Sequence, residues 1–193
     1  MPLGMTVQTP NGPFTLARGC DGCTLCCKVL AAPPLNKPMG QWCTHCVQGV
    51  GCGIHATRPD VCRGFHCYWL INAELGEEWQ PELCHIVLSL DLDGRRLNAN
   101  ADPDHPDAWV REPYYSQLKA WARFALPRNG QVVAYDSDQV FVILPDRHVE
   151  LGRFGPDDYI FIEHLPGDRW DAHKVNEEEA ATLQRSGRVG PTA

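Results

Sequence analysis

The chain has 193 residues, of which 44% are hydrophobic and 21% charged, and its formal net charge is −7. This composition is typical of a soluble globular protein and excludes a disordered one, and the length suffices for one domain with a real core. No run of 18 apolar residues is present, so we expect no membrane span. The acidic balance, without a basic stripe, argues against a nucleic-acid partner.

The N-terminal third carries little regular pattern. The first residues show no basic segment followed by an apolar one, so we expect no secretory signal and a reducing, cytoplasmic location. Residues 1–17 look irregular, and residues 18–70, rich in proline and glycine, show no sustained helical or strand period. One short helix is predicted there, with Thr57 as its cap and Pro59 in its first turn. The order of this segment must come largely from a bound centre.

A periodic pattern begins near residue 84. Residues 85–92 and 95–99 flank an Asp-Gly pair and predict a β-hairpin with a tight turn. A helix is predicted from Pro113 to about Leu126, because apolar side chains recur there at helical spacing. Further strands are predicted over 131–135, 139–144, 147–151 and 159–163.

These patterns predict an α+β fold. Consecutive strands joined by short turns favour an antiparallel sheet. We expect an irregular Cys-rich metal-binding module over 18–70, packed on an antiparallel sheet with one main helix over 84–175. A polar C-terminal tail, 176–193, follows, with a short helix and a loose end at Ser186–Ala193. All these parts are expected to form one compact unit.

Nine of the ten cysteines lie within 48 residues. Four thiolates must converge to hold a metal ion or an iron–sulfur cluster, and short spacings bring them together at little loop-closure cost. The predicted metal ligands are Cys20, Cys23, Cys26, Cys27, Cys43, Cys46, Cys52, Cys62 and Cys67. Cys84 stands apart, directly before a predicted strand, and is expected to be a buried apolar residue.

The cysteine pattern also allows two uses other than metal ligation. An even number of cysteines allows a disulfide framework, and a Cys-x-x-Cys pair allows thiol redox chemistry. A reducing compartment and a chain of this length both disfavour disulfides. Between Arg18 and Cys67 five basic residues stand against two acidic ones, a local charge of +3. Cations stabilise a thiolate centre, so this excess favours ligation.

Known cysteine spacings narrow the choice of centre. The bacterial ferredoxin run requires a cysteine where Leu30 stands, and the radical-SAM spacing Cys-x3-Cys-x2-Cys is absent. A Cys2His2 finger is excluded because His55 and His66 are eleven residues apart. No nucleophile elbow, phosphate loop or paired-carboxylate motif is visible, so the sequence predicts no catalytic residue. The histidines outside the module, such as His85 and His105, are scattered and predicted to have no special role.

The cysteine pattern nevertheless matches a family. It reads Cys20-x2-Cys23-x2-Cys26-Cys27, a distal Cys43, Cys52-x-Ile54, and Arg58-Pro59-x2-Cys62-Arg63-x-Phe65-x-Cys67. In this string the chain resembles the YkgJ-type cysteine-cluster family, whose CxxCxxCC domains are described as zinc- or iron-chelating. The match covers about residues 18–70 and eight family cysteines. It departs from the family at His55, where tyrosine is usual, and at Cys46, an additional cysteine.

The resemblance implies metal binding in a bacterial-type cytosolic protein. Zinc held by thiolates, in a structural or metal-handling role, is the first hypothesis, because closed thiolate sites do no redox work and tolerate irregular spacing. The second is an iron–sulfur protein, in electron transfer or as an accessory to a protein-modifying enzyme, since a flagellin lysine methylase carries a related cluster. The number of centres and the roles of His45, His55 and His66 stay open, and no protein partner is identified.

Overall fold

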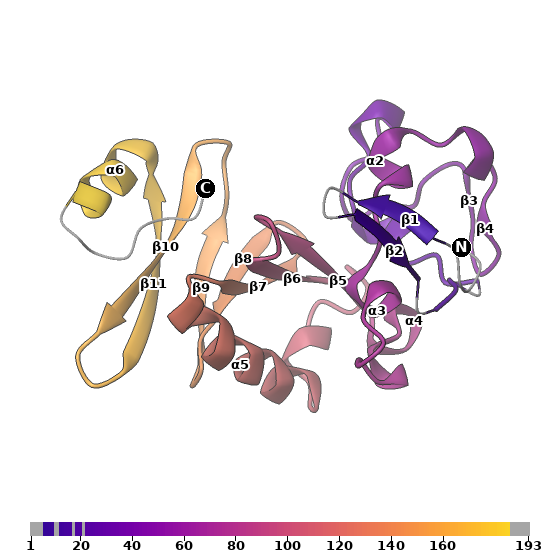
Figure 1. The fold of residues 1–193 in the computed structure, drawn as a ribbon. Helices are drawn as coiled ribbons and strands as arrows, with labels where there is room; N and C mark the ends of the chain where they lie inside the picture. The colour runs from indigo at the N-terminus through magenta and orange to yellow at the C-terminus, as the bar shows by residue number, and fades with distance from the viewer. Residues whose placement is uncertain (1–5, 10–11, 17, 21, 186–193) are drawn as a thin grey trace. The chain divides into compact units, whose positions relative to one another are not determined.

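The computed structural model is of the mixed α+β class, which confirms the predicted fold class. It describes residues 6–9, 12–16, 18–20 and 22–185. The chain divides into two compact units, one of Met1–Ser89 with Asn100–Ala108 and the other of Leu90–Ala99 with Trp109–Ala193. The strands β5 (Ile86–Asp91) and β6 (Arg96–Ala101) each have residues in both units. Both are labelled in Figure 1.

The first unit consists of short elements joined by turns. Its helices are α1 (Cys26–Val29), α2 (Asp60–Arg63), α3 (Tyr68–Ile71) and α4 (Pro81–Cys84), with 3-10 turns at Pro33–Leu35, His55–Thr57 and Glu77–Trp79. Two antiparallel strand pairs accompany them, β1 (Thr6–Thr9) with β2 (Gly12–Thr15) and β3 (Cys46–Val47) with β4 (Gly51–Cys52). Every one of these helices has four residues, too few to be stable without tertiary contacts.

A small apolar cluster and one arginine hold these elements together. Leu25, Val29 and Val87 are buried against one another, and partly buried Cys23, Cys26, Leu30, Phe65 and Cys67 pack on them. Arg18 donates hydrogen bonds to the carbonyls of Trp69 (2.8 Å) and Asn72 (2.6 Å) and lies 4.7 Å from the Trp69 ring. The guanidinium thereby satisfies carbonyls at the end of α3 and ties the start of the cysteine segment to its end.

The second unit is built on a five-stranded sheet with the order β5-β6-β7-β8-β9. Its remaining strands are β7 (Gln131–Asp136), β8 (Gln139–Ile143) and β9 (His148–Arg153), and these pair antiparallel. The helix α5 (Tyr114–Ala125) buries Leu118 and Ala122, part of the stripe that helical spacing predicts. A short 3-10 turn, Leu126–Arg128, ends it, and another, Ala108–Val110, precedes it.

A long hairpin and a helix complete this unit. β10 (Asp158–Leu165) pairs antiparallel with β11 (Arg169–Asn176), and α6 (Glu177–Arg185) follows directly. Phe161, Val175 and Ala180 are buried together, so α6 packs its apolar face on the hairpin. The short helix expected after residue 176 is therefore present, whereas Ser186–Ala193, the expected loose end, lies outside the described residues.

Several local expectations need correction. The sheet is mixed and not wholly antiparallel, because β6 lies beside β7 although the twelve-residue α5 connects them. A crossover of that length permits parallel pairing. Within residues 1–17, expected to be irregular, β1 and β2 form a hairpin. Thr57 does not cap α2, because Pro59 occupies the cap position and the Thr57 hydroxyl instead donates to the Ile54 carbonyl at 3.4 Å.

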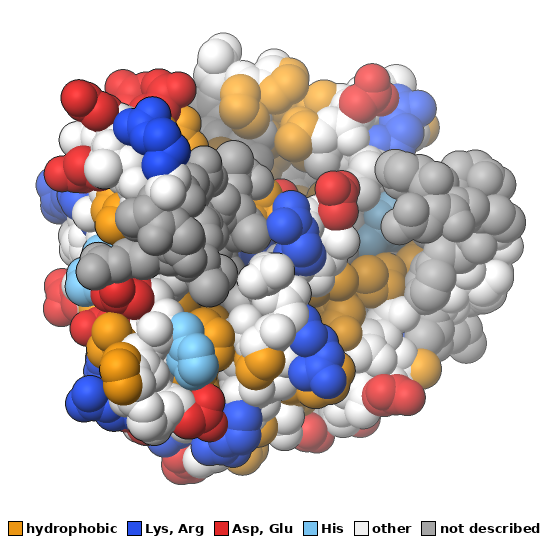
Figure 2. All heavy atoms as spheres, turned by 60° about the vertical axis from the view of Figure 1, so that its left-hand side comes forward, with side chains coloured by type: hydrophobic (Ala, Val, Ile, Leu, Met, Phe, Trp, Pro, Cys, Tyr) orange, Lys and Arg blue, Asp and Glu red, His pale blue; other side chains and the backbone are white. Residues whose placement is uncertain are grey.

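Among the described residues no helix is both long and apolar enough to cross a membrane. Figure 2 shows basic and acidic side chains interspersed, together with apolar ones, on the face that it presents.

Candidate metal centre

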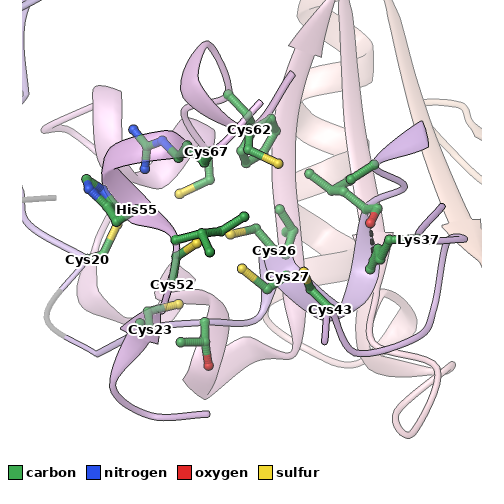
Figure 3. A pocket seen from close by; sticks show the side chains of 18 of the residues that line it. Cys20, Cys23, Cys26, Cys27, Lys37, Cys43, Cys52, His55, Cys62 and Cys67 are labelled. Carbon is green, nitrogen blue, oxygen red and sulfur yellow. Dashed lines mark hydrogen bonds between the residues drawn. The ribbon is translucent and has the colours of Figure 1, made fainter. Parts of the chain in front are cut away.

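Eight cysteines line one cavity of about 520 Å³ in the first unit, which we call the thiol cavity. They are Cys20, Cys23, Cys26, Cys27, Cys43, Cys52, Cys62 and Cys67. Figure 3 shows them around one opening, on segments far apart in the sequence. Of the nine predicted ligands, Cys46 alone does not line the cavity, and the other eight are the cysteines shared with the YkgJ-type pattern. All ten cysteines are free thiols.

Cys20 and Cys23 belong to a tight turn. The Cys23 amide donates to the Cys20 carbonyl at 2.7 Å, which closes the Cys-x-x-Cys loop. Gly22 has φ +86°, and a Cβ there would lie 2.7 Å from the Gly49 carbonyl oxygen. Only glycine fits both the left-handed backbone and this close approach.

Cys26 and Cys27 lie in the first turn of α1, and buried polar contacts hold this helix. Lys37 donates from Nζ to the Lys28 carbonyl at 2.6 Å and also to the Leu30 carbonyl, so it satisfies carbonyls at the helix end. The Cys43 amide donates to the Cys27 carbonyl at 3.0 Å. This bond brings the second cysteine group against the first.

A second Cys-x-x-Cys turn begins at Cys43. The Cys46 amide donates to the Cys43 carbonyl at 3.0 Å, and Cys46 then pairs with Cys52 across β3 and β4. The Cys46 thiol nevertheless contacts the thiol of Cys27. The additional cysteine is thus next to the cavity lining without being part of it.

The last two cysteines come from the short helices α2 and α3. Cys62 lies inside α2, and its amide donates to the Pro59 carbonyl at 3.0 Å. Cys67 is the cap residue of α3, where its carbonyl accepts from Leu70 at 3.0 Å. The Arg58-Pro59 pair thus starts the helix that carries Cys62, as the order of the motif suggests.

The separation of the sulfurs decides what the cavity can hold. Two thiolates about 2.3 Å from one tetrahedral zinc ion lie about 3.8 Å apart. Among the described residues, no three cysteine sulfurs lie within 4.8 Å of one another. Cys27 contacts Cys26 and Cys46, but the three do not form one compact set. The eight thiols thus line one cavity without forming a compact set of three at the spacing of zinc ligands.

Burial keeps several of these thiols protonated in the protein alone. It raises the pKa of Cys23 to about 12 and that of Cys67 to about 11. The pKa of Cys46 is raised to about 11, by burial and by Cys27. A hydrogen bond to Cys26, together with burial, raises the pKa of Cys27. Because the thiolate is the ligand, binding of a cation must displace these protons.

The five basic residues of the cysteine segment divide into different roles. Lys37 and Arg58 line the thiol cavity, whereas Arg18 and Lys28 bind carbonyls and carboxylates elsewhere. The Arg58 Nε atom is buried and has no hydrogen-bond partner among the described atoms. Such a donor fits an anionic group inside the cavity, because an unsatisfied buried N–H is costly.

The three histidines of the segment are separated by the structure. His55 lines the cavity but is exposed, while His45 and His66 do not line it. His66 contacts the Gly64 carbonyl through Nδ1 at 3.0 Å. Cys84 is 2% exposed, and its thiol contacts the Ile86 carbonyl at 3.3 Å, which confirms it as a buried residue apart from the centre.

The apolar part of the cavity lining could not be found from the sequence. It comes from separate turns and includes Leu30, Leu35, Val47, Ile54, Val61 and Phe65. These residues follow no period, so only folding identifies them as one surface. They place apolar side chains beside the thiols, and two of them, Val47 and Val61, are exposed.

Compared with protein-family models, with curated proteins and with solved structures, the chain gives no match in any of the three. The cavity itself therefore carries the functional argument.

Proposed function

We propose that this is an iron–sulfur protein whose cluster is held in the thiol cavity by cysteines. The observation that carries the proposal is that eight thiols face one cavity of about 520 Å³, with no three sulfurs as close as zinc ligands. Iron–sulfur clusters take four cysteine thiolates each. Eight cysteines suffice for two such sets, or for one set with thiols to spare.

The other lining residues support the same function. Lys37 and Arg58 offset the negative charge of a thiolate-bound centre, and apolar side chains make up much of the remaining lining. Net charge, hydrogen bonds to sulfur and solvent exposure set the reduction potential of such a centre. A cluster supplies one-electron chemistry, so the role is electron transfer or support of a protein-modifying enzyme, as the YkgJ-type resemblance suggests. A reducing cytoplasm belongs to the same proposal.

Zinc was the first hypothesis from the sequence, and it is the alternative outcome of the test. Cysteine thiolates are ligands for zinc as well as for iron–sulfur clusters. In this structure, however, the sulfurs would have to move together before four of them could share one ion. That requirement favours a polynuclear centre.

Anaerobic purification followed by absorbance, iron and acid-labile sulfide analysis tests the proposal. We expect a brown protein with iron and sulfide in equal amounts. A colourless protein with stoichiometric zinc and no sulfide would refute it.

Three cysteine variants then test the choice of ligands. Cys62→Ser should lose iron, because Cys62 faces the cavity, while Cys84→Ser is the matched control and should keep it. Cys46→Ser should also keep its iron, since Cys46 does not line the cavity. Loss of iron in Cys46→Ser equal to that in Cys62→Ser would overturn the assignment of the eight cavity cysteines.

A further inference from the structure

Outside the thiol cavity, three potential ligands meet in the first unit. One nitrogen each of His85 and His105 and one carboxylate oxygen of Asp102 all lie within 4.8 Å of one another. None of the three lines the thiol cavity. His85 and His105 are twenty residues apart in the sequence, so no local sequence motif identifies the three residues as a group.

We propose that His85, Asp102 and His105 form a second metal site, for a divalent transition metal such as Zn²⁺, Co²⁺ or Fe²⁺. Two imidazoles with one carboxylate are a donor set that these ions take, and three protein ligands leave at least one position for water or another small ligand. The site is independent of what the thiol cavity holds.

Backbone hydrogen bonds hold the three residues in one place. His85 ends α4 with φ +59°, and its carbonyl accepts from the Asp102 amide at 2.8 Å. The Asp102 carbonyl in turn accepts from the His105 amide at 2.7 Å. The chain therefore fixes the three Cα positions before any ion binds, which lowers the ordering cost of binding.

The Asp102 carboxylate is oriented by contacts to one of its two oxygens. Its Oδ1 accepts from Lys28 Nζ and, at 3.2 Å, from the Asp104 amide. Its Oδ2 faces Nδ1 of His85 at 4.0 Å. A ligating carboxylate is commonly held in this way, with one oxygen bonded to the protein and the other directed at the metal.

The 4.0 Å separation between Oδ2 and Nδ1 is informative. It is too long for a hydrogen bond. Two ligand atoms, each about 2.1 Å from one tetrahedral ion, lie about 3.4 Å apart. Oδ2 and Nδ1 therefore have no direct bond between them, and a small rotation of the His85 side chain would bring them to the separation of two ligands of one ion.

Local charge also favours a cation at this point. Lys28 Nζ lies within ion-pair distance of both Asp102 and, at 2.6 Å, Asp104. Two carboxylates share one ammonium group, which leaves one net negative charge beside the imidazoles. Asp102 has a side chain only 8% exposed, so water screens this charge weakly.

Binding requires a small side-chain rearrangement. The rings of His85 and His105 are stacked, with centroids 3.7 Å apart and planes 19° apart. An ion must lie near the plane of each ring that ligates it, so the two rings must turn about their Cβ–Cγ bonds. The His85 side chain is 32% exposed, which leaves room for this rotation.

Zinc titration of the protein as isolated, with its thiol site loaded, tests the second site. We expect wild type to bind one more equivalent of Zn²⁺ than His85→Asn or His105→Ala. Asparagine at position 85 tolerates the left-handed backbone, so this variant keeps its fold. His164→Ala is the matched control, because His164 also lies beside a carboxylate, 3.3 Å from Asp168, without a third ligand. It should bind as wild type does.

Cobalt distinguishes this site from the thiols. Co²⁺ in the second site should give weak d–d bands without new thiolate-to-cobalt charge transfer, and these bands should be absent from both histidine variants. Equal zinc stoichiometry in wild type and the His85 and His105 variants would overturn the proposal. So would thiolate charge transfer that accompanies the extra equivalent.

Discussion

The cysteine segment and the sheet unit achieve order by different means. In the segment from Arg18 to His85 the helices have four residues, and Lys28 and Lys37 are buried among hydrogen-bond acceptors. In the sheet unit α5 has twelve residues, β10 and β11 have eight each, and the buried residues are mostly apolar. The first region combines short turns and a small apolar core with buried charged groups, whereas the second is ordered by longer elements that bury apolar surface.

This difference means that the two regions should respond to different perturbations. A region of short elements around a cavity depends on what it binds, because ligand binding and folding share one free energy. A region with a continuous apolar core depends on packing volume. Perturbing one region at a time separates these two dependences.

Removal of the proposed metal centre should have the largest effect. Structural zinc contributes about 10–16 kcal/mol in zinc-finger peptides, which exceeds the stability of many whole domains. After anaerobic chelation we expect amides of residues 20–67 to exchange as in an unfolded chain, while β7, β8 and β9 stay protected. Hydrogen exchange with mass spectrometry measures both. Equally fast exchange in the three strands would show that the regions are not independent.

Lys28→Met should destabilise the cysteine segment by about 3–5 kcal/mol, because it leaves the buried Asp102 carboxylate without its ammonium partner. Urea unfolding followed by exchange of segment peptides measures this cost. Asp104→Asn removes the exposed partner of the same lysine and should cost much less, because water screens that carboxylate. Similar costs for both variants would contradict the role given to burial.

Leu118→Ala should destabilise the sheet unit by about 2–5 kcal/mol, since Leu118 is fully buried on α5 and its removal opens a cavity. Iron content should not change. Phe124→Ala, on the same helix but 65% exposed, is the control and should change stability by no more than about 0.5 kcal/mol. Denaturant unfolding measures the stability of both variants, and iron analysis of the folded protein measures their iron content. Loss of iron in Leu118→Ala would show that the cysteine segment depends on the packing of the sheet unit.

The smallest effect concerns alkaline pH. Burial raises the pKa of Tyr135 above 10.0, against the opposing charge of Arg96. The folded form thus holds this proton to higher pH than the unfolded chain does, so the stability it contributes is present below pH 10.0 and is lost as pH rises further. Tyr135→Phe should weaken the fall in unfolding free energy between about pH 9 and about pH 11. An unchanged slope would exclude Tyr135 as its source.

Regular secondary structure was predictable where one pattern dominated. Helix α5 follows the helical spacing of its apolar residues, and strands β7, β8 and β10 coincide with short runs of consecutive apolar residues. Strand β11 was missed because its buried residues, Ala172 and Val175, do not alternate, and pairing with β10 defines it instead. The sequence predicted a wholly antiparallel sheet because short turns join most of the strands after residue 84. The mixed sheet was missed because the position of β7 beside β6 depends on how α5 packs.

The sequence by itself determined which chemistry to expect of this protein. Cysteine density, the two Cys-x-x-Cys turns and the Arg58-Pro59 string predict thiolate ligands, because short spacings bring cysteines close at little loop-closure cost. Tertiary structure alone decided that eight of the nine predicted ligands line one cavity, that among the described residues no three cysteine sulfurs lie within 4.8 Å of one another, and that Cys46 is not part of the lining. It also brought His85 to Asp102 and His105. Those distances depend on how separate turns pack, and spacing along a chain does not encode them.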